Sequence, residues 1–293
     1  MSEIFKQKRA VFLLIDDVNH SWFAFINEFK FYKVFVCIGF DHNIKKEDMD
    51  LLEETYSNIN FIKEDRGVAR IYGYKGWRDL NQPGRSYAHE KALYFLSKNI
   101  ESYDYVWMID EDVFLFNENT LINIDLQYQG QDFLVRNINC EKFFNSSDWE
   151  NLWGNGEDIQ GLKEGKAYKD NIGFPRLNPE TDPLYQSICS AVRISKIMLY
   201  SIQSYAAHAK RLFHRDYYLP MSSIYNDYSI ACPLEMQAIT GARRVPWKYH
   251  EINSECIFSP VENKKLEQGF YWHDDIRNFI FLNQDHFGTD GGS

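Results

Sequence analysis

YDYVWMIDEDVFL, residues 103–115, is the segment around which the 293-residue chain is organised. Its first part, Tyr105 to Ile109, is aromatic, β-branched or otherwise apolar, as expected of a strand buried on both faces of a mainly parallel sheet. Three acidic residues follow at once, Asp110, Glu111 and Asp112. The sequence therefore predicts a buried strand that ends in a concentration of negative charge.

A cation at the end of this strand would offset the repulsion and the desolvation of the carboxylates. Side chains at i and i+2 of an extended segment point the same way, so Asp110 and Asp112 can converge on one ion while Glu111 points elsewhere. Hard oxygen ligands favour Mg²⁺ or Mn²⁺, which commonly bind substrate phosphates. The alternative is a solvated acidic turn, but the apolar strand directly before it favours the metal site.

Composition and charge limit the function classes. The chain is 44% hydrophobic and 25% charged, and its formal charge of −10 argues against nucleic acid as a partner. Aromatic residues make up 16%, a content that suits the binding of sugar rings as well as ordinary core packing. We find no internal repeat and no linker, so a single domain over residues 1–293 is the simplest prediction.

The cysteines and the N-terminus bear on the compartment. The five cysteines are an odd number without a CxxC pair, which fits a reducing environment. Residues 1–10 are charged and precede only about six apolar residues, too few for a signal peptide or a membrane anchor. We expect no transmembrane segment and a cytoplasmic protein, with any membrane association peripheral.

The order of elements predicts the sheet. Strands are expected at 10–15, 33–40, 60–63, 131–138 and 187–192, and helices at 21–31, 46–56, 87–98 and 195–211. Residues 117–125 are expected to form a short helix or turn, residues 217–240 one helix or two short ones, and residues 66–85 and 139–183 loops. Alternating strands and helices at the start of a chain predict parallel strands joined by right-handed crossovers. The GxGxxG fingerprint is absent, so NAD or FAD is not expected.

The helix containing Lys91–Phe95, followed by the strand and acidic residues of 105–113, resembles glycosyltransferases of the A-type fold, which use nucleotide-sugar donors. The resemblance extends by order of elements from Ala10 to Phe279 and is most specific over 86–115. Residues 191–195, 216–220 and 272–275 are similar to later segments of such enzymes. It implies a single-domain A-type fold with a mixed, mostly parallel central sheet flanked by helices. Residues from about 10 to 138 would bind the nucleotide sugar, and those from about 139 to 287 the acceptor.

The resemblance also implies roles at the acidic edge. Asp112 would be a direct ligand of Mn²⁺ or Mg²⁺, Asp110 would bind the ion or the ribose, and His273 is the candidate third ligand. The donor nucleotide and its phosphates would contact residues near the ends of the first strands and in the basic loop. The candidates for donor binding are Asp16, Asp17, Arg70, Arg85, Lys91, Asp110 and Glu111.

The implied reaction is metal-dependent transfer of a hexosyl or pentosyl group from a nucleotide diphosphate sugar to a hydroxyl of a glycan acceptor. An inverting enzyme needs a carboxylate to deprotonate that hydroxyl. Asp216, before a predicted helix, is the first candidate, and Asp227 and then Glu235 are the others. Each also has an ordinary structural reading, such as a helix cap or a solvated charge.

Two other classes remain open. Asp-x-Asp after a strand is also found in phosphotransferases of the haloacid dehalogenase type, although these usually place it near the N-terminus and follow it with Thr or Val where Phe114 stands here. A carbohydrate-binding protein without activity is the other alternative. The sequence itself leaves the donor sugar, the base and the acceptor open.

Overall fold

The computed structural model describes residues 7–39, 44–74, 87–141, 183–210, 212, 215–239 and 254–259. Arg85 and His273 lie outside these ranges, as does most of the predicted 139–183 loop. Among the described residues, no helix is long and apolar enough to cross a bilayer.

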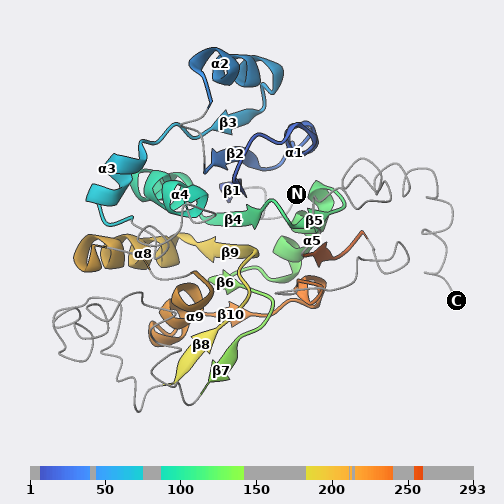
Figure 1. Cartoon of the computed structure of the whole chain (residues 1–293). Coiled ribbons are helices and arrows are strands. Elements are labelled where there is room, and N and C mark those ends of the chain that lie inside the picture. The colour runs from blue at the N-terminus through green and yellow to red at the C-terminus, as the bar shows by residue number, and fades with distance from the viewer. Residues whose placement is uncertain are drawn as a thin grey trace, which may run out of the picture.

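A seven-stranded sheet forms the centre of the molecule (Figure 1). Its strand order is β10-β6-β9-β4-β1-β2-β3, and β9 alone runs antiparallel to its neighbours, β4 and β6. This confirms the predicted mixed, mostly parallel sheet. The strands are β1 (Arg9–Ile15), β2 (Lys33–Ile38), β3 (Ile59–Phe61), β4 (Tyr105–Asp110), β6 (Phe133–Leu134), β9 (Ala191–Ser195) and β10 (Ile230–Ala231).

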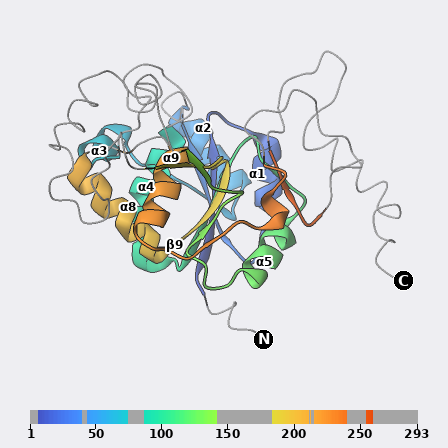
Figure 2. The ribbon, with the colours of Figure 1, turned by 90° about the horizontal axis from the view of Figure 1, so that it is seen from below.

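Helices cover both faces of the sheet, as Figures 1 and 2 show. One face carries α3 (Arg66–Ile71), α4 (Tyr87–Lys98), α8 (Lys196–Ala209) and α9 (Arg215–Tyr225); the other carries α1 (His20–Ile26) and α5 (Glu118–Gln127). Helix α2 (Lys46–Thr55) lies beside β3 at the edge. The short pairs are β5 (Phe114–Leu115) with β11 (Ile257–Phe258) and β7 (Asn139–Glu141) with β8 (Leu184–Gln186); two 3-10 turns, η4 (Ile100–Ser102) and η5 (Leu234–Met236), complete the described elements.

Strand β4 is buried on both faces, as its sequence predicts. Val106 and Met108 pack in the core under α4, α8 and α9, whereas Trp107 and Ile109 pack in the core under α1 and α5. Strand alternation therefore turns Asp110 towards the layer that contains α9. The direction of the first aspartate is thus fixed by the apolar pattern before it.

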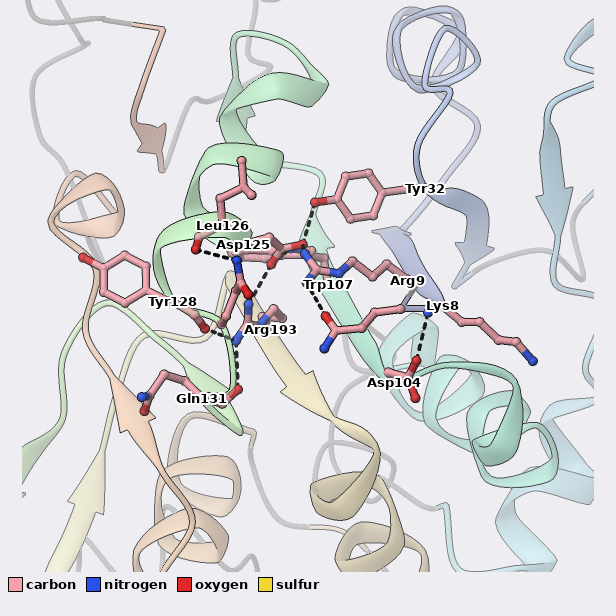
Figure 3. Close-up of polar contacts among 12 residues, drawn as sticks. Lys8, Arg9, Tyr32, Asp104, Trp107, Asp125, Leu126, Tyr128, Gln131 and Arg193 are labelled. Atoms are coloured by element: carbon pink, nitrogen blue, oxygen red, sulfur yellow. Dashed lines mark hydrogen bonds and ion pairs between the residues drawn. The ribbon is translucent and has the colours of Figure 1, made fainter. Parts of the chain in front are cut away.

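A buried charge network joins the strands to α5 (Figure 3). The carboxylate of Asp125, fully buried, pairs with Arg9 and with Arg193, whose Nη1 lies 2.8 Å from Asp125 Oδ1. Tyr32 donates its hydroxyl to Asp125 Oδ2 at 2.6 Å, and the Trp107 indole donates to Oδ1 at 3.2 Å. Arg193 also donates to two backbone carbonyls of the α5–β6 turn. The network ties β9 to β1, β4 and α5.

The structure differs from the sequence prediction in several elements. The helical region predicted at 217–240 is helical only to Tyr225, the end of α9, and β10 and the turn η5 follow it, because Ile230 and Ala231 pair with β6. The first residues of the loop predicted at 139–183 form β7, which pairs with β8. Residues 66–71 form α3 rather than a loop, because the Asp65 carboxylate accepts the Val68 N–H at 2.8 Å and caps a helix that Gly67 disfavours. The strand predicted at 187–192 is β9 at Ala191–Ser195, and Arg193 lies at its centre. A charged residue in a sequence suggests an exposed position, but Arg193 is fully buried and its charge is paired with that of Asp125.

Candidate functional site

The candidate site lies where β1 and β4 end side by side. The two strands run parallel, so their carboxyl ends meet at one edge of the sheet. In the strand order, β2 and β3 lie on the β1 side and β9, β6 and β10 on the β4 side, so the chain changes direction across the sheet between β1 and β4. The Asp16 N–H donates to a carboxylate oxygen of Glu111 at 3.2 Å, and the Trp22 indole donates to the Glu111 carbonyl at 2.9 Å. Glu111 therefore fastens the acidic turn to the end of β1 instead of reaching outwards.

Asp110 is held by backbone and side chain. Its N–H donates to the Ser190 carbonyl at 2.8 Å, which fixes the end of β4 against the segment that leads into β9. Its carboxylate accepts two hydrogen bonds from Arg215, the first residue of α9, with Nη1 2.5 Å from Oδ1 and Nη2 on Oδ2. This bidentate ion pair joins two segments that lie 105 residues apart.

Asp216 lies next to this ion pair, in the first turn of α9. Its Oδ1 accepts the Cys189 N–H at 3.1 Å, and its carbonyl accepts the Ser187 N–H at 2.8 Å. Arg215 Nε is 3.9 Å from Asp216 Oδ1. The loop between β8 and β9 thus holds the start of α9 through the backbone, and a quarter of the Asp216 side chain remains exposed.

Charged groups of both signs act on Asp110. Burial raises the pKa of Asp110 from its ordinary 3.8 to about 6; the Arg215 guanidinium lowers it, and the charges of Asp112 and Asp216 raise it. Burial lowers the pKa of Arg215, but Asp110 and Asp216 hold it above its ordinary value. Asp112 and Asp216 therefore both act on Asp110, and Arg215 is the cation that opposes them.

The carboxylates at this edge have the chemistry of ligands for a divalent cation, but Asp110 already has Arg215 as a partner. Carboxylate oxygens suit Mg²⁺ and Mn²⁺, and Asp110 and Asp112 are close enough to interact. The part of the chain that the structure describes has no group of three or more His, Cys, Asp or Glu placed to hold a metal ion. Each oxygen of Asp110 accepts a hydrogen bond from Arg215, so a cation that approaches from the same side must take the place of the guanidinium.

Helix α4 also begins at this edge. The position of a Cβ at Gly39, just after β2, would lie 3.5 Å from the Ile15 carbonyl and 3.6 Å from the Ala88 nitrogen in the first turn of α4. Lys91, one turn further on, is 1% exposed and donates from Nζ to the Ile38 carbonyl at 3.0 Å. Lys91 therefore fastens α4 to the end of β2, and the helix brings its positive N-terminus to the edge.

The other predicted site residues are dispersed. Asp17 is exposed and accepts the Val18 N–H, and Arg70 is exposed at the end of α3. Asp227, exposed with φ of 54°, follows the far end of α9 from Asp216, and Glu235 lies near the Tyr128 hydroxyl. The structure brings together Asp16, Asp110, Glu111, Asp112 and Asp216, with Asp17 next to Asp16. Arg70, Asp227 and Glu235 lie on other elements.

Arg215 is the residue that sequence reasoning missed. The available signal was the dipeptide Arg215–Asp216 before a predicted helix, together with a carboxylate cluster that lacked a cation. The fold is needed to show that Arg215 lies beside the carboxylate of Asp110. The backbone donors at Ser187 and Cys189 had no sequence signal at all.

Comparison with known proteins gives little at the level of sequence. No protein-family model matches the chain, and no curated protein does. Among solved structures, mouse xyloside xylosyltransferase 1 in its apo form is similar, with a TM-score of 0.34 and 8% identity over 76% of this chain and 84% of that one. That degree of likeness is too low to assign an activity, so the function is argued from the site.

Proposed function

We propose that the chain is a glycosyltransferase that moves a sugar from a nucleotide diphosphate sugar to a hydroxyl group of a glycan acceptor. The supporting observation is that one ion pair, Asp110–Arg215, holds the end of β4 and the start of α9 together, so that Asp216 lies beside the acidic edge. Ligands of open α/β sheets bind at such a switch point, outside the carboxyl ends of the strands. The fold alone would fit many activities.

The donor's diphosphate is a good leaving group only if its developing charge is neutralised. The start of α4 and the start of α9 place helix N-termini at this edge, and Arg215 adds a full positive charge. Asp112 and Asp110 would hold Mn²⁺ or Mg²⁺, which supplies Lewis-acid stabilisation of the leaving diphosphate when bound. Asp16 and Glu111, joined by a hydrogen bond, would line the donor side.

Asp216 is the proposed base of an inverting transfer. The Cys189 N–H donates to Oδ1 and orients the carboxylate, which would take the proton of the acceptor hydroxyl. Negative charge in the first turn of α9 is favourable there. Asp227 is the weaker candidate because it lies beyond the opposite end of that helix.

Release of nucleoside diphosphate from a panel of nucleotide hexoses and pentoses, with Mn²⁺ and with EDTA, tests the proposal. We expect one donor to be hydrolysed in Mn²⁺, and Asp112→Ala to abolish that release. Asp216→Asn should lower transfer to an acceptor by roughly 10²–10⁴-fold. Asp50→Asn, at an exposed position of α2, is the matched control and should leave the rate unchanged.

Other outcomes would replace the proposal. Loss of transfer in Asp227→Asn but not in Asp216→Asn would move the base to the far end of α9. Phosphate release from phosphoesters would favour a phosphotransferase, and glycan binding without donor hydrolysis a carbohydrate-binding protein. We also propose a cytoplasmic location, since the five cysteines are an odd number without a CxxC pair.

A further inference from the structure

The cation already beside Asp110 belongs to the chain itself. Both carboxylate oxygens accept hydrogen bonds from Arg215, and the side chains are only 16% and 23% exposed. A metal ion approaching these two oxygens from the same direction would overlap the guanidinium. We propose that Arg215 is an internal competitor of the divalent cation: the Asp110–Arg215 ion pair and a cation bound to Asp110 exclude each other. This inference rests on the proposed metal-dependent function.

Charge balance favours the exchange when the cation is present. The guanidinium offers Asp110 one positive charge, whereas a divalent ion shared by Asp110 and Asp112 offers two to a pair of carboxylates that interact. An ion of charge +2 between two carboxylates therefore attracts each of them more strongly than a single guanidinium does. Without the ion, Arg215 pairs with the charge of Asp110.

The exchange needs only a side-chain movement. The start of α9 is held independently of Arg215, because the Ser187 and Cys189 N–H groups both donate to Asp216. Arg215 Nε is already 3.9 Å from Asp216 Oδ1, so the released guanidinium has a second carboxylate within reach. Arg215 would therefore stay at the site, one residue from the proposed base, after Asp110 has changed its partner.

Binding of Mn²⁺ alone, measured at pH 8 by the electron paramagnetic resonance signal of the unbound ion, tests the exchange without any turnover. Arg215→Gln removes the competitor and should bind Mn²⁺ more tightly than the wild type, by about 5- to 150-fold, the usual range of coupling between two ligands. Arg215→Lys keeps the charge but loses the bidentate geometry, so its affinity should lie between the two.

A double-mutant cycle shows whether the effect passes through Asp110. Asp110→Asn should weaken Mn²⁺ binding, and Arg215→Gln added to it should cause no further change. Lys196→Gln is the matched control, since it removes one positive charge on α8 at the opposite end of β4 and should leave the Mn²⁺ affinity unchanged. Thermal unfolding of each variant, followed by circular dichroism, establishes that it is folded; if Arg215→Gln is not, Arg215→Lys decides.

Equal or weaker Mn²⁺ binding by the Arg215 variants would overturn the exchange, and so would an absence of Mn²⁺ binding in every protein of the set. The reaction is judged separately. The expected affinity pattern without hydrolysis of any nucleotide sugar would refute the glycosyltransferase proposal and leave the exchange standing. Hydrolysis of a nucleotide sugar that persists in EDTA, without Mn²⁺ binding, would overturn the exchange and leave the glycosyltransferase proposal standing.

Discussion

Replacing Asp125 by alanine removes the only carboxylate drawn between two buried arginines in Figure 3, and we expect a large loss of stability. Arg193 is fully buried and Arg9 is 8% exposed, so neither guanidinium can gain water in place of the lost partner. The Tyr32 hydroxyl and the Trp107 indole lose their acceptor as well. Breaking a buried ion pair from one side costs about 3–5 kcal/mol.

That cost is a large part of the roughly 5–15 kcal/mol by which a domain is stable. The assay is urea unfolding followed by circular dichroism, because Trp107 fluorescence would itself change with the substitution. Asp125→Asn keeps the shape and should cost less than alanine, since it still accepts a hydrogen bond. The matched control, Asp50→Ala on the exposed face of α2, should stay within about 0.5 kcal/mol.

A loss below about 1 kcal/mol in Asp125→Ala would refute the reasoning, because that is the value of an ordinary exposed ion pair. It would mean that the two arginines are hydrated or find other partners. The outcome matters for the site, since Arg193 holds β9 in place and the segment before β9 fixes the backbone of Asp110.

Three other predictions follow from single contacts. In metal-free protein, burial holds the pKa of Asp110 at about 6 against its ordinary 3.8, so the folded state keeps a proton that the unfolded chain releases. The stability that this group contributes is present below about pH 4 and is lost as the pH rises through about 6, by up to about 3 kcal/mol. In urea unfolding, the free energy of unfolding of the wild type minus that of Asp110→Asn should therefore fall across this pH window. A rise would contradict burial as the cause of the raised pKa. Gly73→Ala places a Cβ 1.9 Å from the Ala206 carbonyl oxygen at φ of 92°, whereas Gly130→Ala at φ of 78° meets no atom within 4 Å. Thermal unfolding should show that Gly73→Ala loses more stability than Gly130→Ala, by about 1–3 kcal/mol. Equal losses in the two variants would exclude the clash as the cause. Asp65→Ala removes the cap of α3 and should cost about 1 kcal/mol and speed amide hydrogen exchange in α3 alone, while unchanged exchange there would show that the cap is dispensable.

Local pattern was enough to predict much of the fold. The apolar run before Asp110 predicted a strand buried on both faces, and the helical spacing from Tyr87 to Lys98 predicted α4 with the bounds that the structure has. Ser195 was predicted to start a helix, and its hydroxyl does accept the Met198 N–H. In each case the physical cause lies within about a dozen neighbouring residues.

Pairings between distant segments could not be predicted from one sequence. Arg193 and Asp125 are 68 residues apart, and Arg215 and Asp110 are 105 apart. Each side chain alone has the properties of a solvated charge, and only the fold shows that it has a buried partner. The sequence predicted a divalent metal ion beside Asp110, whereas the described structure has the Arg215 guanidinium there.

A crystal structure grown with Mn²⁺ and the nucleoside diphosphate released in the hydrolysis assay would examine the acidic edge directly. We expect the diphosphate outside the carboxyl ends of β1 and β4, the ion on Asp112 and Asp110, and Arg215 no longer bonded to Asp110. A diphosphate bound elsewhere, or bound at this edge while Arg215 still occupies both oxygens of Asp110, would contradict the assignment.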